Sequence, residues 1–145
     1  GDCTNHPNPI LDRRLRLESV PNAMDQARVA AANMLGGDRE YSAVPWFWSD
    51  QYELKLQMVG FSSDGDEEVV RGDIANDSFA IFYLKDKKIV AVDTVNSMRE
   101  FMLCKKMIGS EVDTTRLADP EVNLQDLTSP WLRSMRSTQP SVRPG

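Results

Sequence analysis

The sequence has 145 residues, 41% of them hydrophobic and 27% charged, as expected of one globular domain rather than a disordered chain. Its 17 basic and 22 acidic residues give a net charge of −5, which argues against a general nucleic-acid binder because such proteins present a basic face. No apolar run is long enough for a membrane span, and no basic segment followed by an apolar stretch indicates a signal peptide.

The cysteines and the histidine exclude several kinds of site. Cys3 and Cys104 lie far apart in the sequence, which favours a reducing, cytoplasmic location over a disulfide scaffold. His6 is the only histidine, so a multi-histidine metal site has too few ligands and a Ser-His-Asp triad has little support. The glycines form neither a dinucleotide-binding motif nor a P-loop. No catalytic residue and no metal ligand is therefore assigned.

The first forty residues predict a loop followed by a helix. Prolines and asparagines indicate loop over the first twenty residues, with a short extended piece near 13–17. A helix is predicted over 21–35, because Pro21 suits a first helical turn and Gly36 and Gly37 are typical of a helix end. One face of this helix carries small side chains, mostly alanine, at helical spacing.

A run of strands follows, after an unusual aromatic segment at 41–52 for which no element is predicted. Alternating apolar and polar residues predict a half-buried strand at 53–58, and a second strand is predicted at 67–74. The segments 78–84 and 88–95 flank three polar residues and predict a hairpin. The short connections make these strands antiparallel.

The C-terminal third predicts a second helix at 97–108. Ser97 and Glu100 have the spacing of a capping box, and Met98, Phe101, Met102 and Ile108 are expected to share its buried stripe. Short helical turns are predicted after Asp113 and at 123–127, and 128–145 is interpreted as a flexible basic tail. The fold class is therefore α+β, with an antiparallel sheet of about four to five strands and flanking helices.

Five motifs in order carry a family resemblance. They are Gly1-Asp2, ESVPNAMDQA at 18–27, VPWFWSDQY at 44–52, VRG at 70–72 and VAVDTVN at 90–96. Together they resemble the C-terminal portion of FAD-dependent, NAD(P)H-using ferredoxin reductases. That family includes putidaredoxin and rubredoxin reductases and the reductase components of aromatic dioxygenases. The resemblance covers about residues 1–127.

The resemblance implies a division of the chain and a set of partners. Residues 1–37 correspond to the end of an FAD-binding domain, 38–127 to the reductase C-terminal domain, and 128–145 to a tail. FAD is implied in the parent enzyme, with NAD(P)H bound elsewhere in it and a ferredoxin or rubredoxin-type iron–sulfur protein as electron acceptor. The rest of the reductase chain is a further partner. Without it, this chain is expected to lack FAD and to be inactive.

The resemblance also implies roles for five residues. Asp2 corresponds to the aspartate that hydrogen-bonds the ribityl chain of the flavin. The Val20 backbone corresponds to the helix start that faces the flavin pyrimidine ring, and a helix N-terminus does offer free N–H groups and a partial positive charge. Trp48, with Trp46 second, corresponds to an aromatic wall beside the flavin. Arg28 is expected to meet an acidic acceptor protein.

The residues by themselves leave ordinary interpretations open. Asp2 fits a solvated terminal acid, the two tryptophans fit core or interface packing, and Arg28 fits a solvated face. The alternative function is a stand-alone protein-interaction or assembly module with no redox role, using the aromatic segment as its contact surface. With either function, apolar area on the 21–35 helix predicts self-association of this chain.

Overall fold

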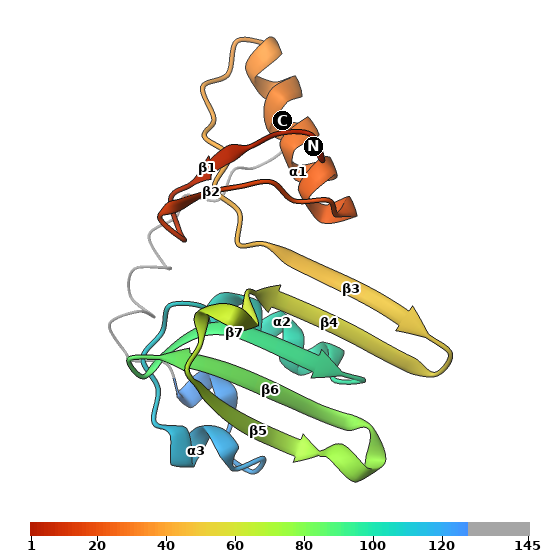
Figure 1. The fold of residues 1–145 in the computed structure, drawn as a ribbon, viewed down its shortest axis with the longest axis vertical. Helices are drawn as coiled ribbons and strands as arrows, with labels where there is room; N and C mark the ends of the chain where they lie inside the picture. The colour runs from red at the N-terminus through yellow and green to blue at the C-terminus, as the bar shows by residue number, and fades with distance from the viewer. Residues whose placement is uncertain (128–145) are drawn as a thin grey trace.

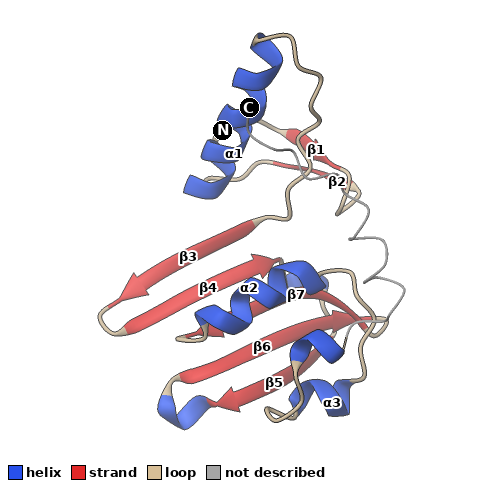
Figure 2. Ribbon diagram, turned by 180° about the vertical axis from the view of Figure 1, so that it is seen from behind, coloured by secondary structure: helices blue, strands red, loops and turns tan. Residues whose placement is uncertain are grey.

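A five-stranded antiparallel sheet dominates the computed structural model, which describes residues 1–127 (Figure 1). Its strands, in spatial order, are β3 (Trp46–Gln51), β4 (Leu54–Gly60), β7 (Lys88–Val95), β6 (Ser78–Lys85) and β5 (Glu67–Asp73). One face of the sheet is covered by α2 (Met98–Met107), α3 (Thr114–Ala118) and the short turn η3 (Leu124–Asp126), as Figure 2 shows. The predicted α+β class and the antiparallel sheet are confirmed.

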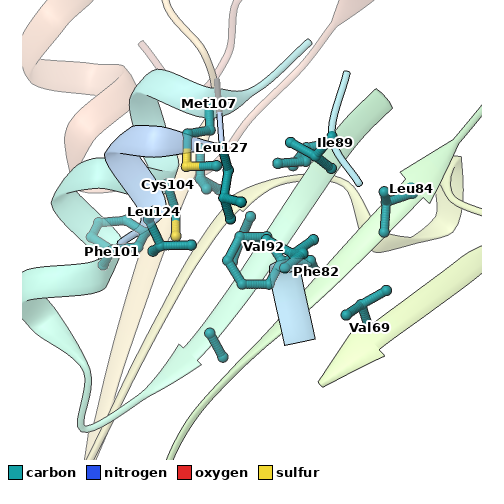
Figure 3. Close-up of a cluster of buried hydrophobic side chains, with 14 residues drawn as sticks. Val69, Phe82, Leu84, Ile89, Val92, Phe101, Cys104, Met107, Leu124 and Leu127 are labelled. Atoms are coloured by element: carbon teal, nitrogen blue, oxygen red, sulfur yellow. The ribbon is translucent and has the colours of Figure 1, made fainter. Parts of the chain in front are cut away.

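The core lies between this face of the sheet and the helices. Inward-facing side chains of four strands, such as Phe82 and Val92, pack against Phe101 and Cys104 of α2 and Leu117 of α3 (Figure 3). These five side chains are at most 1% exposed. Burying one such apolar side chain contributes about 1.5–3 kcal/mol, so this cluster supplies the main driving force for the sheet region.

The predicted hairpin is confirmed as β6 and β7. Lys85 pairs with Lys88, and the two residues between them, Asp86 and Lys87, both have positive φ, at 50° and 62°. Left-handed backbone at both central positions is the geometry of a two-residue turn whose twist matches that of the flanking strands. The strands predicted at 53–58 and 67–74 appear as β4 and β5, with short turns η1 (Ser62–Asp64) and η2 (Ile74–Asn76) at the ends of β5.

The N-terminal region consists of a hairpin and a helix beyond the β3 edge of the sheet. The helix α1 (Val20–Met34) confirms the prediction for 21–35. The extended piece expected near 13–17 is confirmed as β2 (Arg13–Leu15), whereas the loop expected before it was wrong at β1 (His6–Asn8), which pairs with β2. The Asn8 side chain organises the connection: its Oδ1 accepts from the backbone N–H groups of Ile10 and Leu11. Strands of three residues are too short for a periodic sequence signal.

Two details predicted for the second helix were wrong, although α2 and the turns after it are confirmed. Ser97 makes no side-chain capping bond, and the Glu100 carboxylate, which would complete a capping box, instead accepts from Arg71 Nε at 3.0 Å. Met98 and Met102 are 57% and 56% exposed instead of buried. The buried face centres on Cys104, and at about 100° per residue Met102 lies nearly opposite.

The predicted tail at 128–145 lies outside the described residues. Among the helices of residues 1–127, none combines the length and the apolar character that crossing a bilayer requires.

Candidate functional site

The aromatic segment forms the edge strand β3, which the sequence did not reveal. It pairs with β4 from Trp46↔Val59 to Gln51↔Leu54. Strand geometry sends alternate side chains to opposite faces, so Trp46 and Trp48 lie on the α2 side and Phe47 on the other. Pro45 followed by three aromatic residues was the available signal, because proline is tolerated at the start of an edge strand and aromatic residues are enriched in strands.

Trp46 is held firmly against α2. Its ring centroid lies 5.8 Å from that of Phe101 and 5.5 Å from that of Trp48. The Lys105 ammonium lies 4.0 Å from the Trp46 centroid, a cation–π contact, and burial lowers the pKa of Lys105. Trp48 is 37% exposed. The three aromatic rings therefore run from the core at Phe101 to solvent at Trp48.

In the first turn of α1, one backbone N–H group makes no hydrogen bond to the N-cap residue. Ser19 is the N-cap, and its Oγ accepts from the Asn22 N–H at 3.3 Å. Pro21 carries no N–H, so the amide left over is that of Val20. Asn22 is buried and donates from Nδ2 to the Leu17 carbonyl at 2.9 Å, which fixes the chain leading into the helix.

A cavity joins the start of α1 to β3. It has a volume of about 320 Å³, and its lining includes Leu17 through Ser19 on one side and Trp46 and Phe47 on the other. Trp48 instead lines a cavity of about 270 Å³ beside Met98 of α2. Trp46 lines both cavities, so it connects the helix start to the exposed tryptophan. Phe47, which the sequence interpretation passed over, is the residue of β3 that joins Trp46 in the first cavity.

An acidic side chain also faces the first cavity. Asp93 of β7 lies in its wall, and the Tyr83 hydroxyl donates to Asp93 Oδ2 at 3.1 Å. Burial raises the pKa of Asp93. Burial first, and the Asp93 charge second, raise the pKa of Tyr83 to about 12. The sequence analysis did not single out this pair; a lone acid in the apolar strand at 88–95 was the signal.

Val20 directly follows the lining residue Ser19 but is not itself in the wall of either cavity, and Asp2 and Arg28 lie away from both. Asp2 is exposed in a turn, which is tied to α1 where the Thr4 hydroxyl donates to Gln26 Oε1 at 2.8 Å. Arg28 is exposed on α1 and forms an ion pair with Asp25 at 2.7 Å. Within residues 1–127, no group of His, Cys, Asp and Glu side chains has the arrangement of a metal site.

This chain is similar in sequence to a reductase family and to individual ferredoxin reductases. The family model described as "Reductase C-terminal" matches residues 46–128. A 5,5'-dehydrodivanillate O-demethylase ferredoxin reductase subunit from a Sphingobium species is 46% identical over 89% of this chain and 32% of its own length. Putidaredoxin reductase from Pseudomonas putida is 44% identical over 88% of this chain and 31% of its own length.

A solved structure is also similar. The crystal structure of the covalent putidaredoxin reductase–putidaredoxin complex superposes with a TM-score of 0.80 and 40% identity. The superposition covers 96% of this chain and 33% of that one. This chain therefore spans about a third of the length of the curated relatives it matches.

Proposed function

The chain belongs to the reductase C-terminal family, and we propose that it is the C-terminal part of a flavin-dependent reductase that passes electrons from NAD(P)H to a ferredoxin or rubredoxin-type protein. Residues 1–37 would complete the FAD-binding domain and 38–127 would form the C-terminal domain. The names of the similar proteins, which are ferredoxin and putidaredoxin reductases, support this proposal.

The observation that carries the proposal is the cavity of about 320 Å³ between α1 and β3. The segment that leads into α1, Leu17 through Ser19, and the start of β3 both line it, although they lie about twenty-five residues apart in sequence. Aromatic and apolar side chains make up much of the wall, and polar groups converge from the start of α1. Flat heteroaromatic cofactors are bound in sites of this composition.

The start of α1 fits one edge of such a ring. The free Val20 N–H is suited to a carbonyl acceptor, and the partial positive charge of the helix N-terminus favours electron density there. A bound flavin supplies the transfer between a two-electron donor and one-electron acceptors. The chain's own contribution is to orient the ring, to stabilise charge near Val20, and to shield it from water with Trp46 and Trp48. Asp2 would bind a flavin hydroxyl as an acceptor.

The acceptor protein is proposed to dock where Trp48 reaches the surface. Arg28 on α1 is exposed and paired with Asp25, so an acidic partner would replace that carboxylate as its counter-ion, although the chain as a whole carries −5. Local fields of this kind steer the association of oppositely charged proteins. An acidic ferredoxin is therefore the proposed partner of Arg28.

The proposal is tested with the longer reductase polypeptide that ends in this chain. We expect it to bind FAD and to reduce both ferricyanide and a [2Fe–2S] ferredoxin with NAD(P)H, whereas the 145-residue chain alone stays colourless and inactive. Turnover by the isolated chain, or a longer polypeptide without flavin, would contradict the proposal.

Arg28→Glu sharpens the docking part of this test. It is expected to slow ferredoxin reduction about tenfold at low salt without changing ferricyanide reduction, because steering acts on the encounter between proteins. Arg116→Glu on α3 is the matched control, since it makes the same charge change at another exposed position. Equal effects of the two variants would rule out a docking role for Arg28.

A further inference from the structure

The sheet has a second, largely apolar face, and no α-helix of residues 1–127 covers it. The register aligns one residue of each strand in a row on this face, and five such side chains span the sheet: Phe47, Met58, Asp93, Ile81 and Val70. A neighbouring row adds Leu56, Val95 and Phe79. We call these eight residues the open face. The helices lie behind the sheet in Figure 1, so the open face is the one turned toward the viewer.

The strands have the composition of a sheet that is covered on both sides. In β6, residues 79–84 are all apolar or aromatic: Ala80, Phe82 and Leu84 face the core, while Phe79 and Ile81 lie on the open face. An antiparallel sheet with one face in water normally alternates apolar and polar residues. Val70 on the edge strand β5 remains 40% exposed. Contiguous exposed apolar area of this kind marks a contact surface.

We propose that the open face is the seat of the nucleotide-binding part of the same reductase polypeptide. This inference rests on the proposed function, because that function requires the remaining two-thirds of a reductase, which this chain does not contain. The proposed occupant is thus a covalently linked domain rather than a second copy or a separate protein.

The N-terminal region of the chain already contacts residues at the edge of the open face. The cavity at the start of α1 has Phe47, Met58 and Asp93 of the open face in its wall. On the same side, Arg13 of the N-terminal hairpin holds Asp64 of η1 through two hydrogen bonds, at 2.9 and 2.8 Å. The N-terminal region, which the proposal assigns to the FAD-binding domain, therefore borders the open face, and the interface continues from one to the other.

The polar groups on the open face specify the chemistry of the occupant. Asp93 lies at the centre of the row, half-buried, with only the Tyr83 hydroxyl as its side-chain donor among the described contacts. A carboxylate accepts several hydrogen bonds, and a carboxylate buried further needs them. The covering surface is therefore expected to be apolar around Phe79 and Ile81 and to place a hydrogen-bond donor opposite Asp93.

Thiol labelling tests this assignment in a Cys3→Ser background. The buried Cys104 stays silent, because burial raises its pKa to about 12. Ile81→Cys reports on the open face, and Met102→Cys on the exposed side of α2 is the control. Each variant is prepared in the 145-residue chain and in the flavin-containing reductase, both at micromolar concentration, and alkylation rates are compared. Val70→Cys, at an exposed site on the same row, replaces Ile81→Cys if that variant does not fold.

We expect the Ile81→Cys thiol to react about 100-fold more slowly in the reductase than in the isolated chain, and the Met102→Cys thiol to react equally fast in both. Equal rates for Ile81→Cys in the two polypeptides would overturn the inference. Protection in the isolated chain that grows with its concentration, with no further protection in the reductase, would also overturn it, in favour of a second copy. Flavin absorbance of the reductase reports separately on the proposed function.

Discussion

The sheet region and the N-terminal region differ in how their apolar side chains are covered. In residues 46–127, α2, α3 and η3 enclose one face of the sheet, and side chains such as Phe82 and Leu117 are completely buried. In α1 only Pro21 and Asn22 are buried, while Met34 is 87% exposed. The sheet region therefore has its own core, whereas the apolar side of α1 is not covered by any other element of residues 1–127.

The N-terminal region is held largely by polar side-chain contacts. Gln26 of α1 is central: its Oε1 accepts from Gly1 and Thr4, and its Nε2 donates to Asn22 at 2.8 Å and lies 3.3 Å from His6 Nδ1. A typical intramolecular hydrogen bond contributes about 0.5–1.5 kcal/mol net. Such contacts set the orientation of α1 but replace little of the missing apolar burial.

The sharpest test of this contrast is truncation in each region. Phe82→Ala removes a fully buried ring from the core and is expected to lower the free energy of unfolding by about 3–5 kcal/mol. Met34→Ala is the control, expected to have little effect because its side chain is exposed in α1. Urea denaturation followed by circular dichroism measures both; similar losses would mean that the two regions share one core.

The next largest effect is expected at Arg71, which ties the C-terminal loops to the sheet. Its guanidinium, 4% exposed, donates to Glu100 and to the carbonyls of Leu117, Asp119, Pro120 and Val122. Arg71→Met leaves these acceptors without a donor and is expected to cost about 3 kcal/mol. Arg28→Met, which breaks an exposed ion pair, should cost less than about 0.5 kcal/mol in the same denaturation experiment. A small loss at Arg71 would contradict this account.

A helix cap provides a smaller and more local test. Ser19→Ala removes the side chain that accepts from the Asn22 N–H and is expected to destabilise α1 by about 1 kcal/mol. Hydrogen exchange should speed up in α1 and stay unchanged in the sheet, because the sheet region has its own core and α1 contributes no buried apolar side chain except Pro21. Ser97→Ala at the start of α2 is the matched control and should change little, since Ser97 makes no capping bond.

The exposed side of α1 predicts weak self-association of the isolated chain. Ala27, Ala30 and Ala31 are exposed and lie at helical spacing with Met34. Ala30→Glu is expected to abolish concentration-dependent sedimentation by placing a charge in this surface. Ala118→Glu makes the same substitution in α3 and should leave the self-association of the chain unchanged. A monomer at all concentrations for the unmodified chain would refute the prediction.

The smallest expected effect is a pH dependence from the Tyr83–Asp93 pair. Burial raises the pKa of Asp93 above its ordinary 3.8, so the folded chain holds this proton more tightly than the unfolded chain. The contribution of Asp93 to the free energy of unfolding is therefore complete at pH values below 3.8 and is lost as the pH rises through the raised pKa of the folded chain. Asp93→Asn should remove this loss in urea titrations at several pH values. Increasing stability of the unmodified chain over that range, attributable to Asp93, would contradict the sign.

The sequence predicted those elements whose signals are local. The 21–35 helix is marked by Pro21 and by two glycines, and the β6–β7 hairpin by polar residues between apolar runs. The capping box does not form: Ser97 makes no capping bond, and Glu100 is engaged by Arg71, which lies twenty-nine residues away in the sequence. Met98 and Met102 were misplaced because tertiary packing, and not apolar character alone, decided which side of α2 faces the sheet.

The candidate site was predictable only in part, for a similar reason. The family resemblance named Trp46, Trp48 and the Val20 backbone, and the fold places Trp46 and the lead-in to α1 around one cavity. Phe47 and Asp93 were passed over because their position depends on strand register, which brings β3, β4 and β7 side by side. No local sequence motif predicts the register of these three strands.

We propose that the segment leading into α1 and the aromatic strand β3 form the wall of a flavin site, which the rest of a reductase completes. A crystal structure of the FAD-containing reductase that ends in this chain tests it most directly. We predict the flavin ring beside the cavity of Leu17 through Ser19, Trp46 and Phe47, with a pyrimidine oxygen within hydrogen-bonding distance of the Val20 N–H and with Trp48 between ring and solvent. A flavin bound away from both elements would contradict the account.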